Sequence, residues 1–276
     1  CEAGDDSDEE IVAFYQEISD RFLARVGEHY DRVKIHVECG LYVMEPDDDF
    51  IYAQDNARYA RRSIRNSYSN TIAFYEEKLR SKSIKKASII PNFERAIDND
   101  SIQVYLQPKC SARNDSIIGA EALSRFYDED GELLSPALYV PILEKAGIVS
   151  RLDYRVLEKS VELLCKWQEE GRELFPISVN LSRTSIHHSD IVERYMKIVE
   201  ENGIPFSCVP VELTETATLN NVMIRDFTEK LVNAGFALHM DDFGSGYSSL
   251  ITLSELPFNT LKIDKSLVDC IHQQKG

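Results

Sequence analysis

The sequence predicts an α/β fold in which strands and helices alternate from about residue 101 onward. Apolar runs of strand length alternate there with segments that have helical apolar spacing. The runs are apolar on both faces, which is typical of parallel strands that are covered on both sides. Three of the helical segments end at a glycine (Gly171, Gly203 and Gly235), a residue that commonly terminates helices.

The expected elements follow one another at short intervals. In the first half of this region we expect strands at 102–106 and 117–123, and helices at 136–147 and 153–170. In the second half we expect a strand at 177–181, a helix at 188–202, a strand at 209–214, a helix at 221–234, a strand at 236–241, a helix at 247–255 and a strand at 259–263. The helix at 153–170 has the clearest pattern, because Leu157, Val161 and Leu164 recur at helical spacing.

The N-terminal segment predicts a smaller α+β unit. Helical apolar spacing favours a helix at 11–26, and the charged stretch at 56–79 is also expected to be helical. Between them, 33–44 alternates and is interrupted by Gly40, which indicates one or two strands. We therefore divide the chain into three parts: a segment at 1–80, a connector at 81–97 and a main domain at 98–276.

Composition excludes several classes of function. The 276 residues carry a net charge of −16, so a DNA or RNA duplex is not an expected partner. No apolar run approaches the roughly 18 residues of a membrane span, and no signal peptide opens the chain. The six cysteines form no C-x-x-C pair, which favours free thiols in a reducing compartment. We expect a cytoplasmic location.

Polar residues interrupt the apolar runs near the ends of five expected strands. They are Glu121, Asn180, Glu212, the pair Asp241 and Asp242, and Lys262. Gaps of 32 and 29 residues separate the middle members, which is about one strand–helix repeat. In a β/α barrel the carboxyl ends of the strands converge on one site, so these side chains are expected to meet there.

Four carboxylates in one site repel one another unless cations neutralise them. Ligation by oxygen alone selects hard ions such as Mg²⁺ or Mn²⁺. The adjacent Asp241 and Asp242 could hold two ions, an arrangement that cleaves phosphodiesters. Each residue taken singly has a plainer interpretation: a strand-end acid can cap a helix or face solvent, and Asn180 can cap a turn.

Six motifs, in order, closely resemble the EAL domain, a bacterial signalling family. They are Tyr105-Leu106-Gln107-Pro108, Glu121-Ala122-Leu123 with Arg125, Val179-Asn180-Leu181-Ser182, Glu212-Leu213-Thr214-Glu215, the ten residues from Asp241 to Leu250, and Leu261-Lys262-Ile263-Asp264. The resemblance runs from about Asp98 onward. It implies a modified TIM (β/α) barrel that hydrolyses cyclic di-GMP to linear pGpG with Mg²⁺ or Mn²⁺.

The resemblance also implies a role for each site residue. The first metal is assigned to Glu121, Asn180, Glu212 and Asp241. The second metal is assigned to Asp241 and Asp242. Lys262 would orient the attacking water or stabilise charge, and Glu215 would support the glycine-containing loop after Asp242. The contacts with the dinucleotide are assigned to Gln107, Leu123 and Arg125.

The N-terminal segment more faintly resembles the second half of a GGDEF domain. The likeness rests on the Val37–Leu41 strand and the Asp55–Ala60 helix, and the catalytic GGDEF hairpin is not in this sequence. A generic α/β regulatory or dimerisation segment is the alternative interpretation. Neither one predicts cyclase activity.

The sequence departs from the family at its end. Family barrels have two further strands after the lysine strand, and this sequence has twelve residues after Asp264. We therefore expect a barrel without its last strands, a poor catalyst by itself, and a homodimer that covers open sheet edges. Two other functions remain open: a receptor that binds cyclic di-GMP without cutting it, and a structural unit that binds no nucleotide.

Overall fold

The computed structural model describes residues 8–30, 35–44, 48–65, 71–219, 221–244 and 256–270. The chain divides into two compact units, residues 1–87 and 88–276, which are described separately. Among the described residues, no helix is both long enough and apolar enough to span a membrane.

The first unit contains two short parallel strands with helices. Its elements are α1 (Asp8–His29), β1 (Cys39–Leu41), α2 (Phe50–Ser63), β2 (Ile72–Phe74) and the beginning of α3 (Glu77–Asp98). The backbone of α2 lies so close to β1 that a Cβ on Gly40 would come within 1.9 Å of the Ala57 carbonyl oxygen. Only glycine permits this approach.

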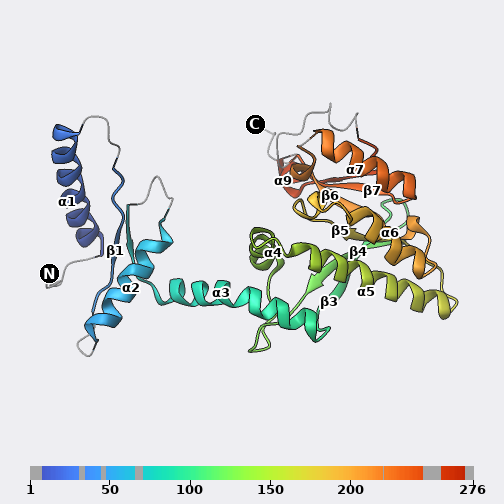
Figure 1. Cartoon of the computed structure of the whole chain (residues 1–276), viewed down its shortest axis with the longest axis horizontal. Helices are drawn as coiled ribbons and strands as arrows, with labels where there is room; N and C mark the ends of the chain where they lie inside the picture. The colour runs from blue at the N-terminus through green and yellow to red at the C-terminus, as the bar shows by residue number, and fades with distance from the viewer. Residues whose placement is uncertain are drawn as a thin grey trace. The chain divides into compact units, whose positions relative to one another are not determined.

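The second unit is built on a six-stranded sheet in which the order in space follows the order in sequence. The strands are β3 (Gln103–Cys110), β4 (Ile117–Arg125), β5 (Ile177–Asn180), β6 (Val211–Thr214), β7 (Leu238–Phe243) and β8 (Thr260–Ile263). The α-helices are the end of α3, then α4 (Pro136–Lys145), α5 (Val149–Glu169), α6 (Ile191–Glu201), α7 (Asn221–Ala234) and α9 (Lys265–Cys270). Three short 3₁₀ segments are η1 (Ser185–His187), η2 (Phe206–Cys208) and η3 (Glu215–Leu219). The sheet curls as part of a barrel, with helices packed along its outer face (Figure 1).

The first pair of strands is antiparallel, whereas β4 to β8 are parallel. The expectation of a purely parallel sheet is therefore wrong for β3. The cause is the connection: β3 and β4 are joined by a turn at 111–116, and so short a link can join only antiparallel neighbours. Because of this pairing, Gln107 lies directly opposite Glu121.

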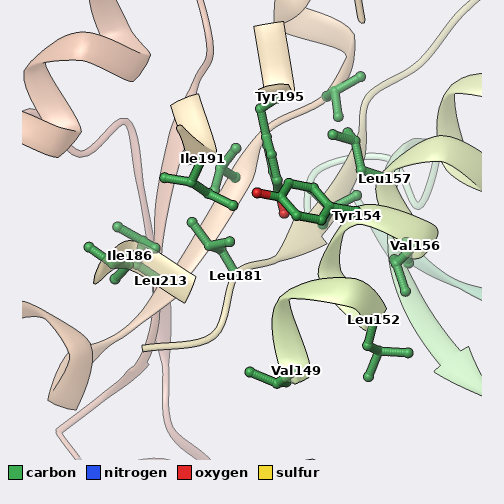
Figure 2. Close-up of a cluster of buried hydrophobic side chains, with 14 of the residues drawn as sticks. Val149, Leu152, Tyr154, Val156, Leu157, Leu181, Ile186, Ile191, Tyr195 and Leu213 are labelled. Carbon is green, nitrogen blue, oxygen red and sulfur yellow. The ribbon is translucent and has the colours of Figure 1, made fainter. Parts of the chain in front are cut away.

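The hydrophobic core lies between the sheet and its helices. Figure 2 shows residues of α5 and α6, including Leu157 and Tyr195, packed against Leu181 and Leu213. Leu181 directly follows β5, and Leu213 belongs to the neighbouring strand β6. In β6, Leu213 is fully buried on this outer side, so the alternation of a strand turns its neighbour Glu212 to the inner side. The helices thus fix which residues line the inside of the curl.

Most expected elements of the second unit are found at their places. The expected helix at 56–79 is wrong at 72–74, where β2 lies. The expectation of one or two strands at 33–44 is met by β1 among the described residues, and the connector at 81–97 lies within α3. The helix at 247–255 lies outside the described residues.

Candidate metal centre

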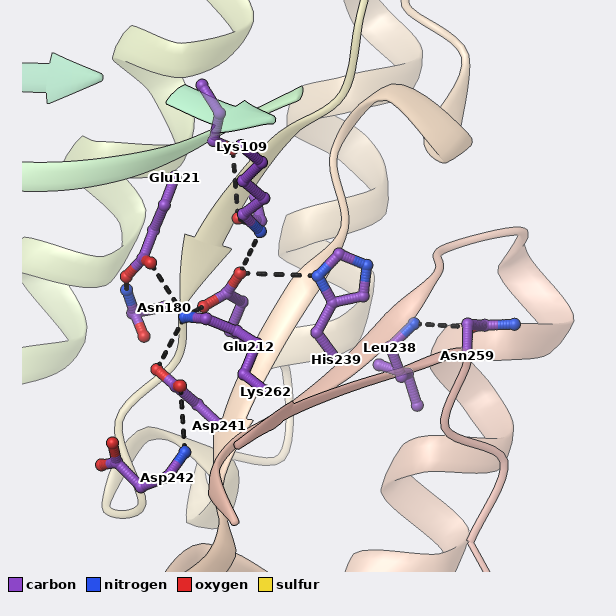
Figure 3. Close-up of polar contacts among 12 residues, drawn as sticks. Lys109, Glu121, Asn180, Glu212, Leu238, His239, Asp241, Asp242, Asn259 and Lys262 are labelled. Atoms are coloured by element: carbon purple, nitrogen blue, oxygen red, sulfur yellow. Dashed lines mark hydrogen bonds and ion pairs between the residues drawn. The ribbon is translucent and has the colours of Figure 1, made fainter. Parts of the chain in front are cut away.

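The carboxyl ends of the parallel strands bring the acidic side chains together. Glu121 of β4, Glu212 of β6 and Asp241 of β7 each offer a carboxylate oxygen, and these oxygens lie within 4.8 Å of one another. In the sheet, β6 and β7 are neighbours and β5 separates β4 from β6, and each of the three side chains points into the curl (Figure 3). This cluster is a set of hard oxygen donors of the kind that Mg²⁺ and Mn²⁺ prefer.

Lys262 of β8 lies among the same three carboxylates. Its Nζ is 2.8 Å from Glu121 Oε2, 2.5 Å from Glu212 Oε2 and 2.9 Å from Asp241 Oδ2. Burial alone would lower the pKa of Lys262, but the hydrogen bonds to Glu121 and Glu212 outweigh it and raise the pKa above its usual range. Lys262 is therefore a fixed positive charge beside the acidic cluster.

Glu212 is the most enclosed member, with a fully buried side chain. Burial alone would raise its pKa, but hydrogen bonds from His239, Lys109 and Lys262 hold the pKa well below the usual range. A buried carboxylate costs several kcal/mol unless it is paired. Glu212 is thus kept as a charged carboxylate, as its predicted role of metal ligand requires.

Asn180, the last residue of β5, orients Glu121. Its Nδ2 donates a hydrogen bond of 2.8 Å to Glu121 Oε1, while Oε2 of the same carboxylate accepts from Lys262. The amide oxygen of Asn180 is not used in that bond, so it remains a candidate metal ligand. The structure therefore brings together four of the five predicted ligands.

Asp242 is placed differently from the other acids. It has a positive φ of 56°, and its backbone N–H donates to Asp241 Oδ1 at 2.9 Å. Its carboxylate is exposed and is not part of the cluster of three. Although Asp242 is largely exposed, partial desolvation and then the neighbouring charge of Asp241 raise its pKa. The assignment of a second metal to Asp242 stays a prediction.

Glu215 begins the 3₁₀ segment η3 and is buried. Its Oε2 accepts a hydrogen bond of 2.6 Å from the backbone N–H of Gly244. Gly244 has a φ of +96°, and a Cβ there would come within 1.9 Å of Leu267. Glu215 thus fixes the first glycine of the loop after β7, and the rest of that loop, 245–255, lies outside the described residues.

The predicted nucleotide-binding residues line two different cavities. Leu123 and Arg125 line a cavity of about 500 Å³ that also reaches Asn180 and Asp153. Gln107 lines a second cavity, of about 550 Å³, inside the curl, together with Glu121 and Lys262. Glu121 lines the second cavity and its partner Asn180 lines the first, so this hydrogen-bonded pair lies between the two cavities.

Three residues of the site were missed by sequence reasoning. Lys109 and His239 both contact Glu212, and the buried Asp153 lines the first cavity. A signal was present for two of them. Lys109 lies two residues after Gln107, and His239 lies two residues before Asp241, so the period of a strand places each on the same face as a predicted site residue.

Asp153 gives a prediction for stability and pH. Burial raises the pKa of Asp153 to about 6, although hydrogen bonds from Ser185 and Ser182 oppose the shift. Because the ordinary value is 3.8, the folded chain binds the extra proton between about pH 4 and pH 6, and Asp153 weakens the fold as the pH rises through that window. Relative to Asp153→Asn, the free energy of unfolding should fall by about 2 kcal/mol from pH 4 to pH 7, because the carboxyl is already about half ionised at pH 4 in the unfolded chain.

Urea unfolding at several pH values measures this difference. Asp226→Asn, at an exposed carboxylate that pairs with Lys230, is the control for the loss of a surface charge. A difference between the wild type and Asp153→Asn that is constant from pH 4 to pH 7 would show that folding does not raise the pKa of Asp153.

The family model of the EAL domain matches residues 91–276. The chain belongs to the EAL domain family. It is 33% identical to an uncharacterized protein of Azorhizobium caulinodans, over 85% of this chain and 32% of that protein. It is 26% identical to the bifunctional diguanylate cyclase/cyclic di-GMP phosphodiesterase MucR of Pseudomonas aeruginosa, over 91% of this chain and 38% of that protein.

A solved structure of an EAL protein also matches. The PaMucR phosphodiesterase in complex with c-di-GMP has a TM-score of 0.63 and 28% identity, and the match covers 68% of this chain and 76% of that one. The predicted EAL membership and the TIM-barrel-like α/β class are confirmed. The EAL chain described here spans about a third of the length of the curated relatives it matches.

Other predictions are not tested by these findings. The family model begins at residue 91, so the GGDEF likeness of the first segment stays a prediction. The same holds for the division at 1–80, 81–97 and 98–276, for the homodimer, for the cytoplasmic location and for the missing strands.

Proposed function

We propose that this EAL domain hydrolyses cyclic di-GMP to linear pGpG with two Mg²⁺ or Mn²⁺ ions. The observation that carries the proposal is the cluster of Glu121, Glu212 and Asp241, whose oxygens converge within 4.8 Å at the strand ends of an EAL fold. The c-di-GMP complex of PaMucR, a phosphodiesterase, supports the choice of substrate. Residues 98–276 would carry the chemistry, and residues 1–80 would regulate it.

The donor set fits a hard divalent ion. The first ion would be held by Glu121, Asn180, Glu212 and Asp241, and the second by Asp241 and Asp242. When bound, such ions supply an activated water and neutralise charge on the phosphate. They also explain how a chain with a net charge of −16 accepts an anionic dinucleotide.

The protein side chains would perform the remaining tasks. Lys262 would donate a hydrogen bond to the attacking water or to the phosphate, because its ammonium is fixed within 2.9 Å of the metal-ligand oxygens. Water attacks phosphorus, the bond from phosphorus to the 3′ oxygen breaks, and that oxygen leaves with a proton. The cyclic dinucleotide is thereby opened to pGpG.

Leu123 and Arg125 would hold a nucleotide in the first cavity, and Gln107 would contact it from the inside of the curl. The Arg125 guanidinium already lies 5.5 Å from the ring centroid of Tyr105, the residue opposite Leu123. A planar guanidinium can bind a phosphate or the edge of a guanine with two donors. Arg125 is thus the predicted anchor for the substrate.

The proposal is tested by calorimetry with cyclic di-GMP, with and without Mg²⁺, followed by chromatography of the products. The 276-residue chain and the longest form that its gene encodes are compared. Appearance of pGpG only when the metal is present supports the proposal. Tight binding with the dinucleotide recovered intact from both forms would instead make the protein a receptor, and absence of binding would favour a structural unit.

The choice of metal gives a second prediction. Ca²⁺ prefers more ligands at longer distances than Mg²⁺, so it should bind the carboxylates but support hydrolysis on the order of 10²-fold more slowly. Initial rates measured with each ion at saturation test this. Equal rates with Ca²⁺ and Mg²⁺ would be incompatible with a compact octahedral pair of ions.

A further inference from the structure

Lys109 reaches the acidic cluster from β3, the strand at the opposite edge of the sheet from β8. It lies near the end of β3, yet its Nζ is 2.7 Å from Ser178 Oγ of β5 and 2.6 Å from Glu212 Oε1 of β6. The side chain therefore crosses the inside of the curl, past β4 (Figure 3). The proposed hydrolysis gives Lys109 no role of its own.

The two oxygens of Glu212 have different partners. Oε1 accepts from Lys109 and lies 3.4 Å from His239 Nδ1, whereas Oε2 accepts from Lys262 at 2.5 Å. Lys262 also binds Glu121 and Asp241, so Oε2 is the Glu212 oxygen that faces the other two carboxylates. Lys109 and His239 hold the opposite oxygen, and together they set the plane of the carboxylate.

The ammonium of Lys109 is itself held in place. Ser178 is buried, and its hydroxyl donates to the backbone carbonyl of Ala120 at 3.2 Å while it accepts from Lys109. A charge-assisted hydrogen bond to a buried carboxylate is stronger than a neutral one, and removing one partner leaves the other charge uncompensated. Without Lys109, Oε1 would lose its shortest contact, and the neutral Ser178 and the longer contact with His239 would remain beside Glu212.

We propose that Lys109 is a positioning residue, which fixes the Glu212 carboxylate so that Oε2 faces Glu121 and Asp241 as a metal ligand. The inference rests on the proposed function and adds a residue to it. Among the described residues, the hydrogen bonds of Lys109 go to Ser178 and Glu212, and not to the other assigned ligands or to the residues assigned to the nucleotide. Its effect must therefore pass through Glu212.

The test measures Mn²⁺ binding without nucleotide, by the paramagnetic resonance signal of the free ion. Lys109→Met removes the charge at similar length, and Lys109→Gln removes the charge but keeps a hydrogen-bond donor. Each variant should raise the Kd for Mn²⁺ about 10- to 100-fold, the usual effect of losing a partner of a metal ligand. Lys230→Met, which loses an exposed ion pair with Asp226, is the matched control and should leave the Kd unchanged.

A double-mutant cycle separates positioning from a general effect of charge or folding. In a Glu212→Gln background, Lys109→Met should change the Kd for Mn²⁺ by less than about 3-fold, because the residue through which it acts is already altered. Crystal structures of Lys109→Met and Lys109→Gln should show the Glu212 carboxylate rotated away from its wild-type plane.

An unchanged Kd in a folded Lys109→Met or Lys109→Gln variant would overturn the inference. The same loss of affinity in the wild-type and Glu212→Gln backgrounds would also overturn it. The proposed function fails separately: wild-type protein that binds Mn²⁺ but leaves cyclic di-GMP intact refutes hydrolysis and leaves the positioning role standing. Wild-type protein that binds no Mn²⁺ refutes both.

Discussion

Asp241→Ala is expected to abolish metal binding and hydrolysis together. Asp241 supplies one of the three converging carboxylates, and it is the residue assigned to both ions. Its Oδ1 also accepts the backbone N–H of Asp242 at 2.9 Å, so the substitution also disturbs the second assigned ligand. The rate of pGpG formation should fall by at least about 10³-fold, because water activation and charge neutralisation are both lost.

Calorimetry with Mn²⁺ and initial rates at saturating metal measure the two effects. Asp226→Ala is the control, since this exposed carboxylate of α7 lies in an ion pair with Lys230. It should retain the wild-type rate and affinity. Near-normal hydrolysis by Asp241→Ala would show that the converging carboxylates are not the metal site.

Lys262→Met is expected to separate metal binding from turnover. The ammonium lies within 2.9 Å of oxygens from all three carboxylates, so it repels a divalent ion that binds the same oxygens. Affinity for Mn²⁺ should therefore stay equal or rise. Hydrolysis should fall by about 10²-fold or more, because the donor to the attacking water or phosphate is lost.

Binding of cyclic di-GMP should persist in Lys262→Met, since Leu123 and Arg125 line a separate cavity. Lys197→Met, at an exposed lysine of α6 near Glu201, is the control and should behave as the wild type. A loss of Mn²⁺ binding in Lys262→Met that equals the loss in Asp241→Ala would mean that Lys262 organises the cluster and has no separate catalytic role.

The acidic cluster was predictable because parallel strands obey a simple rule. Glu121, Glu212 and Asp241 each interrupt an apolar run near its carboxyl end, and such ends meet at one edge of the sheet. The structure brings the three together. The position of Asp242 could not be read in the same way, because it depends on a positive φ at the end of β7.

Three other features, Lys109, β2 and Asp153, depend on three-dimensional geometry that the apolar pattern of the sequence does not reveal. Lys109 was missed because only the carboxyl ends of parallel strands were considered. Its long side chain reaches Glu212 from the antiparallel strand β3. β2 was assigned to a helix because a strand of three residues is too short to show a period of its own against the charged stretch before it. Asp153 was missed because burial, which raises its pKa, comes from α5 packing against the residues after β5.

The central claim is that the cluster around Asp241 cuts a phosphodiester with water. The most direct measurement is the mass of the product formed from cyclic di-GMP with Mn²⁺ in water enriched in ¹⁸O, using the longest form of the protein that its gene encodes. The account predicts pGpG that carries one ¹⁸O atom on its terminal phosphate, formed by the wild type and not by Asp241→Ala. Recovery of cyclic di-GMP unchanged at saturating Mn²⁺ would contradict it.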